Sequence, residues 1–205
     1  MIYSQIEDIL NGFPTKNFKR GEVIYSEGEA PESVYFINFG LVGLFYIAQS
    51  GKETFLRIFD DKSIFGHRSY FAEENYHGSS IALKETQIII VPKKECDAIC
   101  EQHPQLLKLL LKQVSKDLAS AELRISQLQD KSSEQRIAES LWFLKLRSPN
   151  QTWTRKEVGE YSGSSHESVA RFLTKAENLG ILKKEGRDIE ILDEDRLLNF
   201  ENVKK

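Results

Sequence analysis

The chain is 205 residues long, with a formal net charge of −3 at pH 7 and 40% hydrophobic residues, which allows one large domain or two small ones with buried cores. No apolar run approaches the ~18 residues of a membrane-spanning helix, and the N-terminus lacks a charged-then-apolar signal pattern. Membrane and secreted classes are therefore excluded, and we expect a cytoplasmic protein with no membrane partner.

The N-terminal half is rich in short segments that are predicted to be β-strands. After a brief amphipathic helix over residues 2 to 11, short apolar runs alternate with turn signals from Phe13 to Pro92. The expected strands are Val23 to Tyr25, Val34 to Phe39, Leu41 to Ala48, Thr54 to Phe59 and Ser79 to Val91. Short strands at this spacing favour an antiparallel sandwich or barrel.

Two cysteines, Cys96 and Cys100, lie four residues apart at the predicted start of a helix. They are too few for a disulfide framework or a four-cysteine cluster within one chain, so an iron-sulfur cluster is not expected. Each is interpreted as a small buried hydrophobe. Redox sensing stays open as an alternative, because Lys93 and Lys94 would lower the pKa of a nearby thiol.

A long helix is predicted from Pro104. Its apolar residues recur at alternating spacings of four and three, the a/d pattern of a coiled coil. This seam consists of Leu107, Leu111, Val114, Leu118, Ala121, Ile125 and Leu128. Leu106, Leu109 and Leu110 are expected to pack the start of the helix on its own domain. The later part of the seam has no partner of comparable length in the chain, which favours a parallel homodimer.

The segment from Thr154 to Arg187 has the pattern of a helix, a turn and a second helix. Thr154 and Glu157 have the spacing of a capping box, and Ser164 or Ser165 can cap the second helix after the turn. Gly180 stands where that helix is expected to end. Before this segment, a hinge is predicted at residues 130 to 133, followed by a helix with Ile137, Leu141 and Leu144 on its inner side.

The second helix has two chemically different faces. Its predicted inner face carries Val169, Phe172, Leu173, Ala176 and Leu179, and its outer face carries Glu167, Ala170, Arg171, Thr174 and Lys175. Such a helix fits a DNA major groove. A hairpin with a basic tip over residues 183 to 188 is expected to follow it. From Arg136 to Arg187 there are ten Lys and Arg against six Asp and Glu, a local charge of +4 in an acidic chain.

The run TRKEVGEYSGSSHESVARFLTKAENLGIL, from Thr154 to Leu182, resembles the DNA-binding signature of the CRP/FNR family of bacterial transcription regulators. A looser resemblance covers nearly the whole chain. In that family a Glu and an Arg of the recognition helix read base edges, and these positions fall on Glu167 and Arg171. Arg can bond guanine O6 and N7 together, and Glu can accept from cytosine N4.

His166 and Ser168 complete the expected base-reading set. His166 stands where cyclic-AMP receptors have a further Arg, and Ala170 stands where well-known members have Ser or Gly before the Arg, so the operator sequence is left open. The expected contacts to the DNA backbone come from Thr154, Arg155, Ser165, Lys175, Lys183, Lys184 and Arg187.

The resemblance implies that the β-rich region is a double-stranded, jelly-roll-like β-roll that senses an effector. Its pocket is expected at Gly66, His67, Arg68, Tyr76, His77 and Ser79. Relatives that bind cyclic nucleotides have a Glu after the Gly and an Arg-Ser or Arg-Thr pair for the phosphate. Here His67 follows Gly66, and Tyr76 and His77 stand at the pair, so cyclic AMP is not expected and the effector is unidentified. Arg68 stays open as a phosphate contact.

His67 and His77 also suggest a metal or haem site, because two imidazoles could approach each other across a β-roll. With four histidines in the chain and no HExxH-type spacing, surface or hydrogen-bonded roles are favoured and no metal site is assigned. A pH-sensing role stays open.

These patterns together predict an α+β protein of three parts: a β-roll effector-sensing domain over residues 1–103, a dimerisation helix over 104–131 and a winged helix-turn-helix over 132–205. The predicted function is sequence-specific transcription regulation, without enzymatic activity. Its expected partners are a second copy of the chain, a roughly palindromic DNA operator and RNA polymerase. The alternatives are a cupin-like β-barrel metalloenzyme and a ligand-binding module that does not bind DNA.

Overall fold

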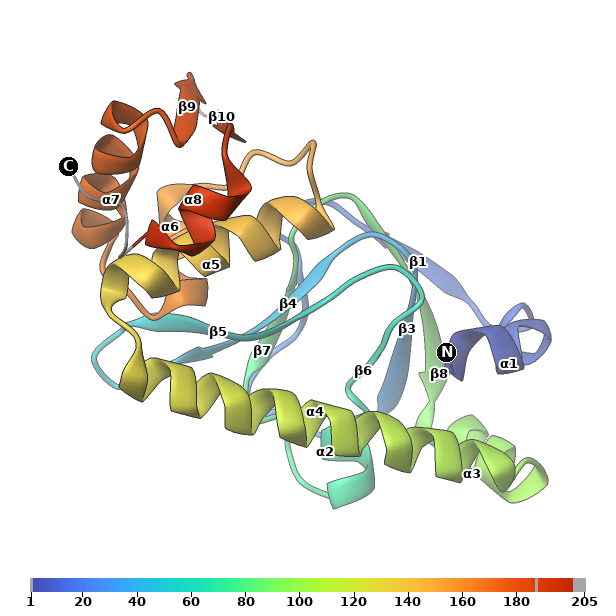
Figure 1. Cartoon of the computed structure of the whole chain (residues 1–205). Coiled ribbons are helices and arrows are strands. Elements are labelled where there is room, and N and C mark those ends of the chain that lie inside the picture. Colours follow the sequence, from blue (N-terminus) through green and yellow to red (C-terminus); the bar gives the residue numbers. More distant parts are fainter. Residues whose placement is uncertain (1, 187, 201–205) are drawn as a thin grey trace. The chain divides into compact units, whose positions relative to one another are not determined.

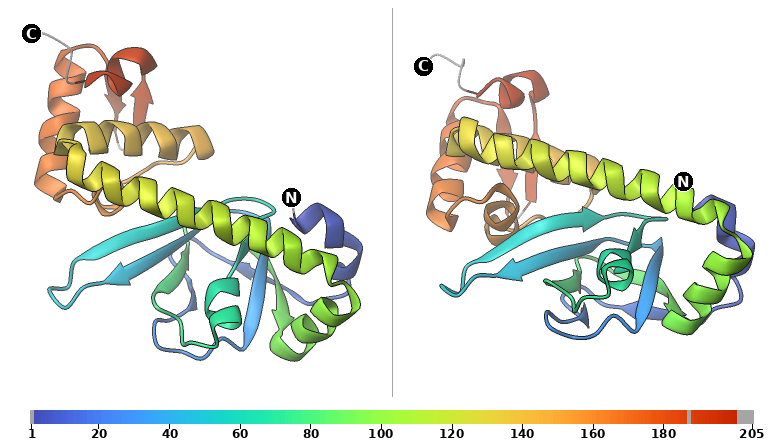
Figure 2. Two further views of the ribbon diagram at one scale, coloured as in Figure 1. Left: turned by 60° about the horizontal axis from the view of Figure 1, so that its bottom comes forward. Right: turned by 90° about the horizontal axis from the view of Figure 1, so that it is seen from below.

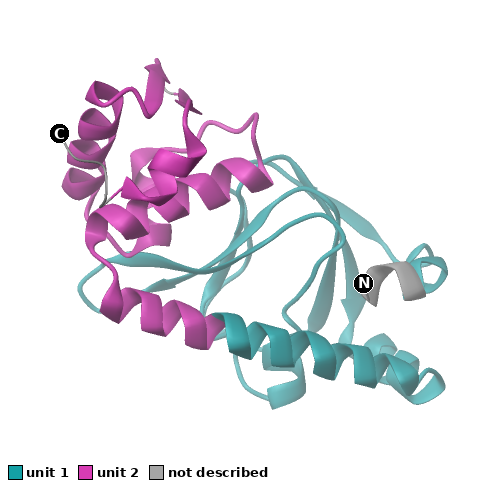
Figure 3. Ribbon diagram, viewed as in Figure 1, with its two compact units in different colours: residues 1–120 teal, residues 121–205 magenta. Residues whose placement is uncertain are grey.

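The computed structural model describes residues 2–186 and 188–200, with side chains described from Ile6 onward. The predicted phosphate contact of Arg187 lies outside the described residues. The chain forms two compact units, residues 1–120 and 121–205, and the boundary between them falls inside one long helix, α4 (Figures 1 and 3). Among the helices described, none has the length and apolar character needed to cross a membrane.

Unit 1 is built on two four-stranded antiparallel sheets, with strand orders β1-β8-β3-β6 and β2-β7-β4-β5. The strands are β1 (Thr15–Phe18), β2 (Val23–Tyr25), β3 (Ser33–Phe39), β4 (Val42–Ile47), β5 (Glu53–Phe59), β6 (Ile64–Phe65), β7 (Ser79–Ala82) and β8 (Thr86–Pro92). The helices are α1 (Ile2–Leu10), α2 (His67–Ala72), α3 (Lys93–Gln102) and the first part of α4 (Gln105–Asp130). This order of strands confirms the predicted antiparallel β-roll.

The single strand predicted from Ser79 to Val91 is wrong, because the chain changes sheets within it. Residues 83–85 separate β7 from β8, and the two strands lie in different sheets. The crossing is held at Thr86, whose hydroxyl accepts from the Leu41 amide at 3.1 Å. Gly40, with φ of 129°, lies against it, since a Cβ there would be only 2.6 Å from the Thr86 Cα. Only a glycine fits this crossing.

The structure also contains strand β1, which the sequence pattern does not predict. It pairs with β8 from Thr15 opposite Ile89 to Phe18 opposite Thr86. Only Phe18 of its four residues is buried. An edge strand with one buried side chain has no apolar alternation, which explains why the pattern missed it.

Two groups of buried residues form the core of unit 1. One lies between the sheets and includes the aromatic rings of Tyr25, Phe65 and Tyr76, with Tyr25 and Tyr76 stacked at 3.7 Å between ring centroids. The other joins α1, α3 and the start of α4 to the sheet, with Leu106 buried and Leu109 and Leu110 packed against it. The predicted packing of these three leucines on their own domain is confirmed.

Cys96 belongs to the second group and Cys100 packs against it. Burial raises the pKa of the Cys96 thiol to about 12 and also raises the pKa of Cys100. Both shifts are opposite to the lowering by Lys93 and Lys94 that redox sensing requires. The prediction of a buried cysteine is confirmed for Cys96, whereas Cys100 is only partly buried.

Unit 2 contains the last turns of α4, then α5 (Ser133–Arg147), α6 (Arg155–Ser162), α7 (His166–Asn178) and α8 (Glu194–Leu198). Strands β9 (Leu182–Glu185) and β10 (Asp188–Ile191) form an antiparallel hairpin, the predicted wing. The core includes Ile137, Leu141, Leu144, Trp153, Val158, Phe172, Leu173 and Ile181. Within this unit α5 packs against α6, α7 and α8.

Along α4 the predicted seam is exposed in the single chain. The exposed fractions are 67% for Leu111, 59% for Leu118 and 58% for Ile125. Figure 2 shows α4 as one continuous helix in both views. A long stripe of exposed leucine and isoleucine side chains on one helix is typical of a surface that binds another protein.

Candidate functional site

Helix α6 and the turn after it set the position of α7. Thr154 caps α6, since its hydroxyl accepts from the Glu157 amide at 3.1 Å and the Glu157 carboxylate accepts from the Thr154 amide at 2.8 Å. Gly163, with φ of 68°, then turns the chain. A Cβ on Gly159 would meet the Ser164 carbonyl oxygen at 3.0 Å. The predicted capping box is confirmed, and the turn packs closely against α6.

Helix α7 has a defined start and a defined end. Ser165 is its N-cap and accepts from the Ser168 amide at 3.1 Å. At the other end Gly180 takes φ of 66°, the Gly180 amide donates to the Glu177 carbonyl at 2.9 Å, and the Ile181 amide donates to the Ala176 carbonyl at 3.0 Å. This pair of bonds is a Schellman motif, which ends the helix as predicted.

The inner face of α7 is buried as predicted at Val169, Phe172, Leu173 and Ala176. Leu179 differs, because it is the C-cap residue and is only partly buried. The burial of one face fixes the rotation of the helix. The opposite face is therefore held toward solvent.

That outer face carries the two predicted base-reading residues side by side. The side chains of Glu167 and Arg171 are 78% and 72% exposed and form an ion pair of 3.2 Å across one helical turn. Arg171 also donates to the Ser168 hydroxyl at 3.4 Å, and His166 is exposed in the first turn. A pair this exposed is worth only about 0.2–1 kcal/mol, so both groups can exchange partners readily.

The predicted phosphate contacts are arranged around α7, and most already have partners. Lys175 contacts Glu134 at 2.7 Å, Lys183 contacts Glu185 at 2.5 Å, and Lys184 contacts Glu177 at 2.6 Å. The hydroxyls of the two cap residues are used in capping, and Arg155 is exposed. These lysines would have to exchange a carboxylate for a phosphate to bind DNA.

The predicted effector-pocket residues separate into a surface group and two interior residues, Tyr76 and His67. Arg68 lies 2.9 Å from the Nδ1 of His77 and 3.1 Å from Glu74, on the exposed surface of unit 1. Gly66 takes φ of 78° at the start of α2, and the Ser79 hydroxyl accepts from the Glu27 amide at 2.9 Å. Tyr76 instead points into the aromatic core.

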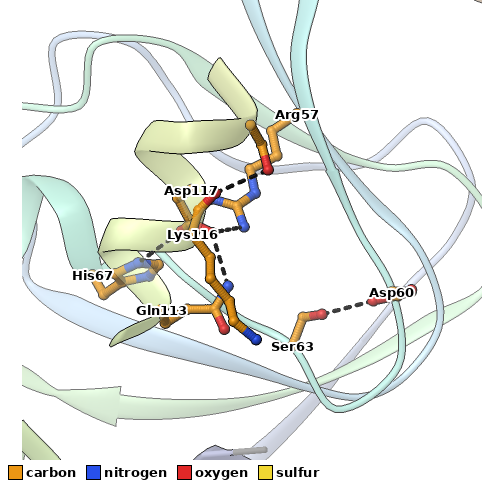
Figure 4. Close-up of polar contacts among 8 residues, drawn as sticks. Arg57, Asp60, Ser63, His67, Gln113, Lys116 and Asp117 are labelled. Atoms are coloured by element: carbon orange, nitrogen blue, oxygen red, sulfur yellow. Dashed lines mark hydrogen bonds and ion pairs between the residues drawn. The ribbon is translucent and has the colours of Figure 1, made fainter. Parts of the chain in front are cut away.

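His67 belongs to a polar cluster that joins three elements of unit 1 (Figure 4). We define this cluster as Arg57 of β5, His67 of α2, and Gln113 and Asp117 of α4. The Asp117 carboxylate accepts from Arg57 and from the Gln113 amide at 2.8 Å, and it lies 3.8 Å from the Nε2 of His67. The side chains of Asp117 and His67 are 16% and 5% exposed.

The contacts in this cluster keep Asp117 charged. Burial of the carboxyl raises its pKa, but the neighbouring His67, the hydrogen bonds from Arg57 and Gln113 and the charge of Arg57 outweigh burial, so the pKa lies well below the ordinary value. The Nδ1 atom of His67 is buried and has no hydrogen-bond partner among the described atoms. The cluster therefore links α4 to the β-roll through ionic contacts, and the Nδ1 atom of His67 lacks a hydrogen-bond partner within it.

Sequence reasoning found His67 but missed Arg57, Gln113 and Asp117. Arg57 and Asp117 are 60 residues apart, so no local pattern links them. One weak signal was present, since Asp117 is the only acidic residue between Gln105 and Ser120. An isolated acid beside an apolar seam is a candidate for a specific partner.

The two histidines considered as metal ligands have different neighbours: His67 faces Asp117, and His77 faces Arg68. Within the described part of the chain, no group of three or more His, Cys, Asp or Glu side chains is arranged to hold a metal ion. The structure thus offers no ligand set for the metalloenzyme alternative among those residues.

Comparisons with known proteins match both halves of the chain. A cyclic nucleotide-binding domain model matches residues 15–103, and a Crp-like helix-turn-helix domain model matches residues 135–200, together more than half of the chain. The transcriptional activator protein Anr of Pseudomonas aeruginosa is 29% identical over 184 residues, which cover 85% of this chain and 75% of Anr. An uncharacterized protein of Haemophilus influenzae is 36% identical over 105 residues, 51% of this chain and 81% of that protein.

Solved structures share the fold. The c-di-GMP responsive global regulator CLP of Xanthomonas campestris superposes with a TM-score of 0.82 at 18% identity, covering 92% of this chain and 98% of that one. FixK2 of Bradyrhizobium japonicum superposes with a TM-score of 0.79 at 23% identity, covering 94% and 99%. At these identities the likeness is one of architecture.

Proposed function

The chain belongs to the CRP/FNR family of DNA-binding transcription regulators, and we propose that it reads its operator through Glu167 and Arg171 of α7. The observation that carries this proposal is the fixed, solvent-facing pair of these two side chains on a helix whose other face is buried. Arg171 can donate two hydrogen bonds to guanine, and Glu167 can accept one from cytosine. His166 and Ser168 stand beside them in the first turn.

Contacts to the DNA backbone are proposed for the ring of residues around this pair. Arg155 is exposed at the start of α6, and Lys175, Lys183 and Lys184 can exchange surface carboxylates for phosphates. Thr154 and Ser165 hold the N-termini of α6 and α7, where backbone amides favour anions. Arg187 completes the proposed set from the sequence.

We further propose that the seam of α4 forms a parallel homodimer. Leu111, Leu118 and Ile125 are more than half exposed in one chain, and a second copy of α4 would cover them. Two reading helices related by a two-fold axis imply a roughly palindromic operator with half-sites ~34 Å apart. A cytoplasmic location and contact with RNA polymerase are proposed with this role.

The regulatory part of the proposal places an effector-sensing domain at residues 1–103, a dimerisation helix at 104–131 and a DNA reader at 132–205. Helix α4 has a polar contact in each unit. Asp117 binds Arg57 in unit 1, while Arg124 in unit 2 donates to the Tyr161 carbonyl at 2.6 Å and lies over the Tyr161 ring. A shift of α4 on the β-roll would therefore displace α6 through the contact of Arg124 with Tyr161, and α6 precedes the proposed reading helix.

The effector stays unidentified, and cyclic AMP is not proposed. His67 is tied to Asp117 and Tyr76 is stacked in the core, so neither offers the carboxylate or guanidinium that the cyclic nucleotide requires. The family consists of transcription regulators, and we propose no enzymatic activity for this chain.

The test begins with selection of bound fragments from random DNA, followed by gel-shift titration of variants on the selected operator. Arg171→Ala is expected to cost about 1–3 kcal/mol and to relax selectivity at its base pair, whereas Lys183→Ala weakens all sequences alike and reduces the salt slope by about 1. Arg196→Ala, an exposed arginine of α8, is the matched control and should leave binding unchanged. Unchanged base selectivity of the Arg171 variant would refute the assignment.

A further inference from the structure

Unit 2 has a concave surface, which we call the α5–wing groove. It lies between the C-terminal half of α5, with the loop after it, and β10 with the start of α8, and it encloses about 520 Å³. In both Figure 1 and Figure 2, α7 lies at one side of unit 2 and the C-terminal end of α5 at the other. The groove is thus separate from the exposed face of α7, while the wing that forms one of its sides also carries Lys183 and Lys184.

Part of the lining of this groove is apolar and incompletely covered. Trp142 is half-buried in its wall, and Leu146, one turn further along α5, is 61% exposed. The opposite side of α5 supplies Leu141 and Leu144 to the core, so Trp142 and Leu146 are not needed there. An exposed leucine beside an indole in a groove is a surface that an apolar side chain of another molecule can cover.

The rim of the groove is acidic. Glu185, Asp188, Glu190 and Glu194 line it, with Lys145 as the one cation among the described lining residues. Lys183 pairs with Glu185 at 2.5 Å beside the groove, so these six residues have a net charge of −2. Lys145 is only 11% exposed and is paired with Asp188 at 2.6 Å. The carboxylates of Glu190 and Glu194 are exposed to solvent at this rim.

This charge contrasts with the rest of the unit. From Arg136 to Arg187 the sequence has a net charge of +4, whereas the groove is lined by Glu185 and by three acids that follow this stretch, Asp188, Glu190 and Glu194. A net negative charge at the groove repels DNA phosphates and anionic lipid, and it attracts cations. The acidic and the apolar lining residues together fit a ligand that is both basic and apolar.

We propose that the α5–wing groove docks a basic amphipathic segment of another protein. An apolar side chain of the segment covers Trp142 and Leu146, and its lysines or arginines pair with Glu190 and Glu194. This docking surface is independent of base reading, since it uses none of the residues assigned to DNA. A polyamine has the charge but lacks the apolar contact, and the test separates the two.

The probe is a synthetic peptide of leucine and lysine in helical periodicity, titrated into the full-length protein. Calorimetry measures binding, and tryptophan fluorescence locates it, because Trp153 is only 2% exposed and Trp142 is the indole at the groove. Saturable binding with a change in tryptophan emission is expected. Leu146→Ser should weaken it about tenfold without changing any charge, and Glu190→Gln with Glu194→Gln should weaken it about tenfold as well.

The matched control is Glu95→Gln with Glu101→Gln, which removes the same charge from exposed acids of α3 and should leave peptide binding unchanged. Equal weakening by the groove pair and the control pair would overturn the proposal, as would equal affinity for an all-lysine peptide or spermine, or no binding at millimolar peptide. Operator binding by Leu146→Ser, which changes no charge, is expected to stay at the wild-type level, so this result is separable from the DNA-reading test.

Discussion

Replacing Asp117 by Asn tests the ionic tie between α4 and the β-roll. The amide keeps the shape of the side chain but removes the charge that faces Arg57 and His67. Breaking a fully buried ion pair costs about 3–5 kcal/mol, but the Arg57 side chain is 35% exposed and water can solvate it in part. We therefore expect Asp117→Asn to lower the free energy of unfolding of unit 1 by about 1–3 kcal/mol at pH 7.

The low pKa of Asp117 also predicts how this difference depends on pH. A carboxyl whose pKa is lower in the folded protein stabilises the fold fully above its unfolded pKa of about 3.9, and the stabilisation decreases as the pH falls toward the folded pKa. The stability difference between wild type and Asp117→Asn should therefore be about 1 kcal/mol smaller at pH 3 than at pH 6, since each pH unit below 3.9 removes about 1.4 kcal/mol.

The assay is urea unfolding followed by near-ultraviolet circular dichroism of tyrosine, because six of the seven tyrosines belong to unit 1. Glu101→Gln, an exposed acid of α3 in the same unit, is the control and should stay within about 0.5 kcal/mol of wild type. The reasoning is refuted if Asp117→Asn is as stable as the control at pH 7, or if the difference does not shrink at pH 3.

Two further predictions concern α4 and α6. Leu118→Glu places a charge in the seam and should convert the proposed dimer to monomer in sedimentation experiments. Leu123→Glu, whose leucine is 60% exposed but lies off the seam, should leave the protein dimeric. Dissociation by both variants would contradict the assignment of the seam as the dimer interface. Thr154→Ala removes the side-chain cap of α6 and should lower the free energy of unfolding of unit 2 by about 0.5–2 kcal/mol. Thr154→Ser should retain most of the stability that the cap contributes. Unfolding is monitored by tryptophan fluorescence. An alanine variant as stable as the serine variant would show that the cap is unimportant.

Much of unit 2 was predictable because its determinants are local. The apolar period of α7, the capping residues Thr154 and Ser165, and the terminating Gly180 all act within one or two helical turns. The same holds for the a/d spacing of α4. These features are determined by neighbours in the sequence, so the sequence alone predicts both the reading face and the seam.

Tertiary structure decided the features that depend on distant contacts. The change of sheet at Thr86, the pairing of β1 and the ion pair of Arg57 with Asp117 each join segments tens of residues apart. No periodicity encodes which strand lies beside which, because pairing depends on how the two sheets close over the core. For that reason the sequence alone determined α7, the proposed DNA-reading helix, and the seam of α4, and only the folded chain showed the contacts of Asp117 on α4 and the groove beside the wing.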